Sequence, residues 1–175
     1  MLIVILAAGV AAADPSATKA APATTPPAEP SLWQVEINAG YGVDINGGAG
    51  AVGMRASPLT LQGTIAIAVN QEPLVYGYGG MMVETLDRGS VGVVAGARLQ
   101  PEGSSWHLAG GGAYVFDPYT LWGAQASAGA CSRHGKTMSL CGDFQITAYF
   151  TGSDLGMKRD VTQAQLALGV MFDAP

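Results

Sequence analysis

Two cysteines and two histidines are the residues of this chain with the most direct potential for nucleophilic, acid–base or metal chemistry. His134 lies between Cys131 and Cys141, so one short loop could present two sulfurs and one imidazole. A structural zinc site uses four ligands in a fixed arrangement, which is more than this loop offers. We therefore predict no metal site, and we interpret His107 as an ordinary strand residue.

Catalysis would need a nucleophile held within hydrogen-bond reach of a base. Neither His107 nor His134 belongs to a recognisable nucleophile motif. The chain has no Gly-x-Ser-x-Gly elbow, and local spacing fixes no pair of carboxylates. We predict no catalytic and no cofactor-binding residue, and hence that the protein is not an enzyme and uses no cofactor.

The spacing of the cysteines favours a disulfide instead. Cys131 and Cys141 flank the segment SRHGKTMSL, whose His134-Gly135 pair is typical of a hairpin turn. Residues on the two sides of such a turn face each other, and export would place them where disulfides persist. We predict a bridge between Cys131 and Cys141.

The elements that must position these residues are β-strands. In WQVEINAGYGV, residues 33–43, large apolar side chains alternate with polar or small residues, which is the period of a strand. Similar alternation recurs in nine segments: 33–44, 49–57, 60–70, 74–86, 91–100, 105–116, 120–132, 139–150 and 161–172. Turn residues separate the segments, so the pattern predicts an all-β antiparallel barrel or sandwich.

The number of strands follows from how a barrel closes. Single-chain bacterial membrane barrels have an even number of strands, so one of the nine segments must be wrong. The least regular region is 49–70, where Pro58 and a shift in the alternation indicate a kink or a bulge. We predict eight strands, with ten as the alternative.

Charge is scarce and is concentrated in the turns. Charged residues are 12% of the chain, about half the usual share for a soluble domain. The polar faces of the segments carry mostly Gly, Ala, Ser, Thr, Gln and Asn rather than Lys and Glu. Lipid around a barrel would enforce this pattern. The net charge of −5 and the lack of a basic stripe exclude nucleic acid as a partner.

Five charged residues nevertheless fall in the middle of alternating segments, on the polar side: Glu36, Arg55, Glu84, Arg98 and Asp143. Inside a narrow barrel, three acids and two bases would have to neutralise one another, because an isolated buried charge is strongly unfavourable. We predict that these five residues form an interior ion-pair network with a structural role.

The N-terminus differs in composition from the rest of the chain. Residues 1–13 have an apolar core followed by small residues, which is typical of a secretory signal peptide. Residues 14–31 are rich in Pro, Ala and Thr and are predicted to be a disordered linker. The barrel domain is predicted to span residues 32–175.

Taken together, the chain resembles the small outer-membrane β-barrels of Gram-negative bacteria over residues 32–172. The resemblance rests on the signal, the Pro-rich lead, Gly- and aromatic-rich strands such as INAGYGVDI and VYGYGG, and the last strand VTQAQLALGVMF. It implies an up-and-down transmembrane barrel of eight strands, located in the bacterial outer membrane and in contact with its lipid.

The resemblance implies a non-enzymatic role in envelope structure, envelope maintenance or surface interactions, because an eight-stranded barrel is filled by its own side chains. Two alternatives remain open. One is a soluble exported barrel that binds a small apolar ligand, and the other is a narrow, porin-like outer-membrane pore. A lipid-modifying enzyme is disfavoured because the histidines lack a motif.

Overall fold

The computed structural model describes residues 31–47, 53–71, 74–85, 89–101, 103–153, 155 and 160–174. The predicted signal peptide, residues 1–13, and the linker up to residue 30 lie outside the described residues. No helix within the described part of the chain is both long and apolar enough to cross a membrane.

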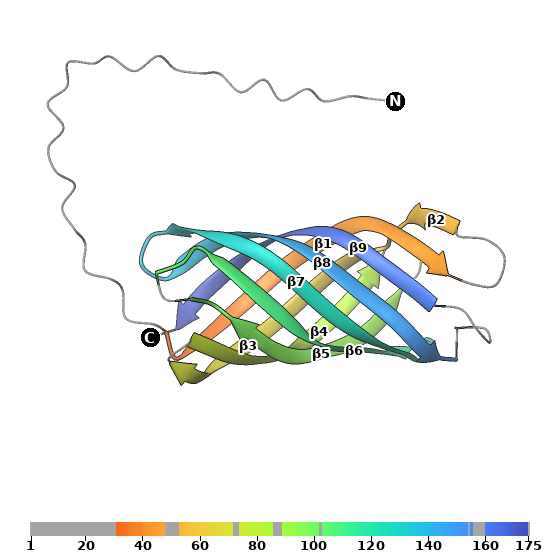
Figure 1. Cartoon of the computed structure of the whole chain (residues 1–175), viewed down its shortest axis with the longest axis horizontal. Coiled ribbons are helices and arrows are strands. Elements are labelled where there is room, and N and C mark those ends of the chain that lie inside the picture. The colour runs from red at the N-terminus through yellow and green to blue at the C-terminus, as the bar shows by residue number, and fades with distance from the viewer. Residues whose placement is uncertain are drawn as a thin grey trace, which may run out of the picture.

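The described chain is a meander of antiparallel strands closed into a barrel (Figure 1). The strands are β1 (Trp33–Gly47), β2 (Gly53–Ala56), β3 (Leu59–Gln71), β4 (Leu74–Thr85), β5 (Ser90–Leu99), β6 (Trp106–Asp117), β7 (Leu121–His134), β8 (Met138–Gly152) and β9 (Asp160–Ala174). From β3 onward each strand pairs with the next in the chain, and β1 pairs with β9 along its whole length to close the wall. The all-β antiparallel fold predicted from the alternation is therefore confirmed.

β2 and β3 share one place in the wall. β2 pairs with the last part of β1, from Val43 to Asn46, whereas β3 pairs with the first part, from Trp33 to Gly40. Between β2 and β3 lie the buried residues Ser57 and Pro58, and proline has no N–H to donate to a ladder. Nine strands with two sharing one place give an eight-stranded barrel. The prediction of eight is confirmed, and the alternative of ten is wrong.

The two ends of the barrel differ. The first residue of β1, Trp33, pairs with the last residue of β9, Ala174, so both described ends of the chain lie at one end of the barrel. This end, the terminal end, also carries the last residues of β3, β5 and β7 and the first residues of β4, β6 and β8. The opposite end, the loop end, carries the last residues of β1, β4, β6 and β8 and the first residues of β5, β7 and β9.

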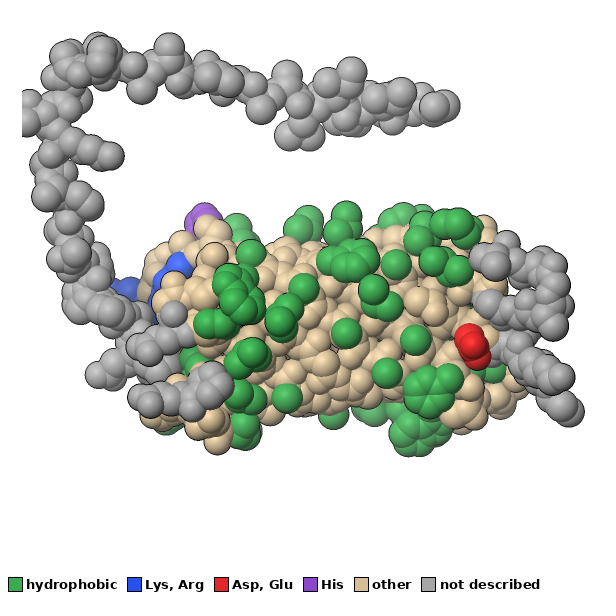
Figure 2. Space-filling view, in the orientation of Figure 1, with side chains coloured by type: hydrophobic (Ala, Val, Ile, Leu, Met, Phe, Trp, Pro, Cys, Tyr) green, Lys and Arg blue, Asp and Glu red, His purple; other side chains and the backbone are tan. Residues whose placement is uncertain are grey.

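Side chains are arranged inside out relative to a water-soluble domain. On β1, Ile37 is 60% exposed on the outer wall, whereas Gln34 and Glu36 are each 3% exposed and point inward. Most other strands alternate in the same way. Figure 2 shows hydrophobic side chains spread over the visible wall and charged side chains near its two ends.

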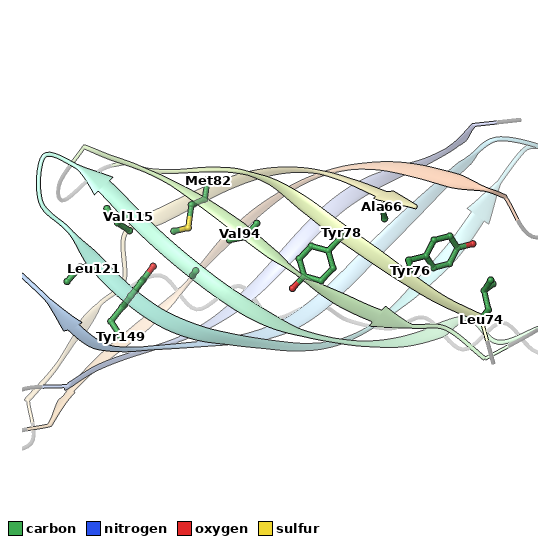
Figure 3. Close-up of a cluster of buried hydrophobic side chains, with 10 residues drawn as sticks. Ala66, Leu74, Tyr76, Tyr78, Met82, Val94, Val115, Leu121 and Tyr149 are labelled. Atoms are coloured by element: carbon green, nitrogen blue, oxygen red, sulfur yellow. The ribbon is translucent and has the colours of Figure 1, made fainter. Parts of the chain in front are cut away.

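Apolar side chains fill part of the interior toward both ends. Val115, Leu121 and Tyr149 are at most 1% exposed and lie toward one end of the barrel, and Leu74 and Tyr76 lie toward the other (Figure 3). The polar inward residues lie along the same interior. They form the candidate site.

Candidate functional site in the barrel interior

The first polar cluster is built around Arg98, which reaches across the barrel from β5 to Glu36 on β1. Arg98 Nη2 donates a hydrogen bond to Glu36 Oε2, and the two side chains are 7% and 4% exposed. Arg98 Nη1 also contacts the sulfur of Met171 at 3.4 Å. A buried guanidinium and a buried carboxylate thus neutralise each other within a closed space, which is the arrangement that burial of charge requires.

His107 and Asp143 form a second buried pair nearby. His107 Nε2 lies 2.6 Å from Asp143 Oδ1, and the side chains are 3% and 6% exposed. His107 is on β6 and Asp143 is on β8, so the carboxylate has to extend over β7, where Gly129 is the residue aligned with both. A Cβ at Gly129 would lie 2.2 Å from Asp143 Oδ1. A glycine at this position is therefore what allows the two side chains to meet.

A small polar cavity of about 20 Å³ lies between these pairs, and Glu36, Arg98 and Asp143 all line it. Its other lining side chains are mostly amides and hydroxyls, among them Gln62, Gln125 and Ser127. Arg98 Nε and Asp143 Oδ2 are both buried without a hydrogen bond from the described protein atoms. A cavity of this size has room for about one water molecule.

A layer of amides continues the polar interior toward the loop end. Gln165 Nε2 donates to Ser57 Oγ at 3.0 Å, to the Pro58 carbonyl at 3.1 Å and to Thr60 Oγ1 at 3.1 Å. These bonds hold β9 against the break between β2 and β3, where the backbone ladder is interrupted. Gln165 thereby replaces part of the pairing that Pro58 removes.

The third polar cluster lies at the loop end and contains Glu84, which is completely buried. Its Oε2 accepts a hydrogen bond from Ser90 Oγ at 2.7 Å, and its Oε1 accepts one from Gln163 Nε2 at 3.0 Å. Close to the same end, Arg55 Nε pairs with Asp44 Oδ2 at 3.1 Å. The Asp44 side chain is fully buried, but that of Arg55 is 45% exposed.

The structure therefore distributes the five predicted ion-pair residues over two regions. Glu36, Arg98 and Asp143 line one cavity in the terminal half of the barrel. Glu84 and Arg55 lie toward the loop end, and Arg55 is on the short strand β2 rather than in the interior. Arg55 is opposite buried Asp44 in the ladder and so points to the same face, but β2 lies at the loop end, where the Arg55 side chain stays 45% exposed.

Two residues of the site were missed from sequence. His107 was interpreted as an ordinary strand residue, but it is the partner of Asp143. Asp44 was not counted among the mid-strand charges, but it is the partner of Arg55. The alternation could have indicated both residues. Asp44 is an even number of residues from Glu36 on β1, and His107 is an even number from Ala109 and Ala113 on β6, so each points to the same face as those residues.

The predicted disulfide is confirmed. Cys131 on β7 and Cys141 on β8 are directly opposite each other in the ladder, with 4.1 Å between their Cα atoms, and their sulfurs are bonded. Cys141 is 4% exposed, whereas Cys131 is partly exposed. The bridge joins the two strands of the hairpin close to the terminal end.

Comparison with known proteins shows a similarity of fold only. No family model and no curated protein matches the chain. Among solved structures, the crystal structure of Neisserial surface protein A (NspA) matches 82% of this chain and 98% of its own length, with a TM-score of 0.54 and 10% sequence identity. The two proteins share a barrel fold. At this identity, the likeness carries nothing about the polar interior.

Proposed function

We propose that the protein is a non-enzymatic β-barrel of the bacterial outer membrane, with a role in envelope structure, envelope maintenance or surface interactions. The observation that carries the proposal is the apolar outer wall. Leu166 and Leu168 on β9 are 71% and 76% exposed, and Ile67 and Val69 on β3 are 58% and 68% exposed. Apolar side chains in such number are unfavourable in water and suit contact with lipid.

The distribution of charge supports the same location. Within the described ranges, each exposed Lys, Arg, Asp or Glu lies at a strand end, in a turn or on the short strand β2. The buried charged residues of the long strands, such as Glu36 and Arg98, face the interior. Lipid favours this arrangement, because a charge near the middle of the outer wall would be transferred into hydrocarbon.

Aromatic side chains mark both edges of the apolar wall. Trp33 and Trp106 are each 47% exposed at the terminal end, and Phe116 and Trp122 are 44% and 53% exposed at the loop end. Trp106 and Phe116 are at opposite ends of β6. Ten residues of a strand tilted by about 40° cover roughly 25 Å, which is the height of the apolar band of a membrane barrel.

The interior disfavours the two alternatives. A soluble barrel for an apolar ligand would direct its apolar faces inward around a large cavity, whereas these faces point outward and the cavity beside Arg98 is polar and about 20 Å³ in volume. A pore would need an open path, whereas Arg98 spans the lumen to Glu36 and the buried side chains of Tyr76 and Tyr149 occupy it elsewhere. A filled interior is the usual condition of an eight-stranded barrel.

Heat-modifiable gel mobility of the membrane fraction tests the proposal. A folded membrane barrel retains its structure in cold detergent, so boiled and unboiled samples should migrate differently. The same purified protein should give no conductance steps in a planar bilayer. Recovery of the folded protein from the detergent-free soluble fraction would contradict the membrane location, and discrete conductance steps would favour the narrow pore.

A further inference from the structure

The disulfide lies beside the buried histidine–aspartate pair. Cys131 Sγ is 3.8 Å from His107 Nδ1, and the other ring nitrogen, Nε2, is 2.6 Å from Asp143 Oδ1. Sulfur, imidazole and carboxylate thus form a continuous row across β7, β6 and β8. This row is the general arrangement in which a base activates a nucleophile and a third group orients the base.

The Asp143 carboxylate determines which ring nitrogen of His107 carries the hydrogen and which one can accept a proton. An ionised Asp143 can only accept a hydrogen bond, so it holds the hydrogen of a neutral imidazole on Nε2. Nδ1 then directs its lone pair at Cys131 Sγ. When the disulfide is reduced, this nitrogen is in position to take the proton of the Cys131 thiol.

The two cysteines differ in access as well as in neighbours. Cys131 is partly exposed, and the next three residues, from Ser132 to His134, are exposed at the terminal end of the barrel. Cys141 is 4% exposed. A reagent that enters from the terminal end can therefore reach Cys131, while Cys141 is held behind it at bonding distance.

We propose that Cys131, His107, Asp143 and Cys141 form a thiol–disulfide exchange site for small thiols and disulfides at the terminal end of the barrel. Cys131 is the attacking sulfur, His107 is its base, Asp143 is a positioning residue, and Cys141 is the resolving sulfur. Each barrel exchanges one disulfide equivalent, so the site adds a redox function to the proposed envelope role without substrate turnover.

The exchange balances in two steps. The Cys131 thiol gives its proton to His107 Nδ1, and the thiolate attacks one sulfur of a small disulfide. The reagent's sulfur–sulfur bond breaks, and one half leaves as a thiol with the proton from His107. Cys141 then gives its proton to solvent, and its thiolate attacks Cys131 Sγ. The bond between Cys131 and the second half of the reagent breaks, and that half leaves as a thiolate, which takes a proton from solvent. The protein dithiol is oxidised by two electrons, and the reagent is reduced. With excess small thiol, the steps run in reverse.

The test uses full-length protein folded in detergent and the small neutral probe 2-hydroxyethyl disulfide. Cys141→Ser leaves Cys131 as a single thiol beside His107, and Cys131→Ser is the matched control that leaves only the buried Cys141. At about pH 6, where an ordinary thiol is almost fully protonated, Cys131 should react about ten-fold faster than Cys141. It should also react about ten-fold faster than Cys131 in the Cys141→Ser/His107→Gln double variant, because glutamine can bond to Asp143 but cannot take the proton.

Asp143→Asn in the Cys141→Ser background should slow the reaction as well, since it removes the group that fixes the imidazole. Equal rates with and without His107, or a faster reaction of Cys141, would overturn the proposal. If the His107 and Asp143 variants lose heat-modifiable mobility, the test is made on the reduced wild-type barrel. Mass spectrometry then identifies which cysteine carries the first adduct. The first mixed disulfide should then be on Cys131. An adduct on Cys141, or no adduct until the barrel is unfolded, would overturn the proposal.

Discussion

Arg98 shows at the residue scale how the barrel accommodates charge in its interior. Its guanidinium binds Glu36. Arg98 also lines a cavity together with Asp143, and Arg98 Nε and Asp143 Oδ2 are both buried without a hydrogen bond from the described protein atoms. An ion pair at this depth contributes to stability only while both partners are present, because either one alone would be a buried, uncompensated charge. The pair is therefore a point at which a single substitution should be unusually damaging.

Arg98→Leu should lower the free energy of unfolding by about 3–5 kcal/mol, because it leaves the Glu36 carboxylate buried without its cation. Urea titration of the protein folded in lipid vesicles measures this change. Arg133→Leu is the matched control and should have a smaller effect, since Arg133 and its partner Asp173 are 47% and 16% exposed. The double variant Glu36→Leu/Arg98→Leu should recover most of the loss. A double variant as unstable as Arg98→Leu alone would show that the ion pair is not the reason.

At the element scale, several glycines that face the interior leave no room for a Cβ atom. Gly96 on β5 is aligned with Gly111 on β6, and a Cβ added at Gly96 would lie 2.2 Å from the carbonyl oxygen of Gly110. This oxygen belongs to the backbone and cannot rotate away as a flexible side chain could. The curvature of the wall at β5 and β6 therefore depends on the absence of a side chain.

Gly96→Ala should destabilise the barrel by roughly 1–3 kcal/mol, the usual range for an overpacked site. Gly110→Ala is the matched control on the outer wall, where the nearest atom to an added Cβ is 3.9 Å away. Its effect should stay within about 0.5 kcal/mol. Urea unfolding in vesicles compares the two variants. Equal losses for both would mean that glycine is needed for a reason other than close approach.

The alternation made much of the wall predictable from sequence, because lipid or packing on one face imposes a period of two on every strand. It predicted the inward positions of Glu36 and Arg98 and the alignment of Cys131 with Cys141 across one hairpin turn. The partner of Asp143 was not predictable in this way. His107 and Asp143 are on strands separated by β7, so their contact depends on barrel closure and on Gly129 rather than on any local spacing.

At the scale of the whole molecule, the central claim is that the apolar wall faces lipid and the polar residues face one another. Spin labels on single introduced cysteines test this directly, because Cys131 and Cys141 are bonded to each other and leave no competing thiol in the described chain. Labels in place of Leu166 and Leu168 report on the middle of the outer wall, and a label in place of Lys136 reports on the exposed turn at the terminal end.

In lipid vesicles, labels at positions 166 and 168 should collide more often with oxygen, which concentrates in hydrocarbon, than with a water-soluble nickel chelate. The label at position 136 should show the opposite preference. This result would place the wall in lipid and the turn in water. Nickel collision rates at positions 166 and 168 that match the rate at position 136 would contradict the membrane barrel.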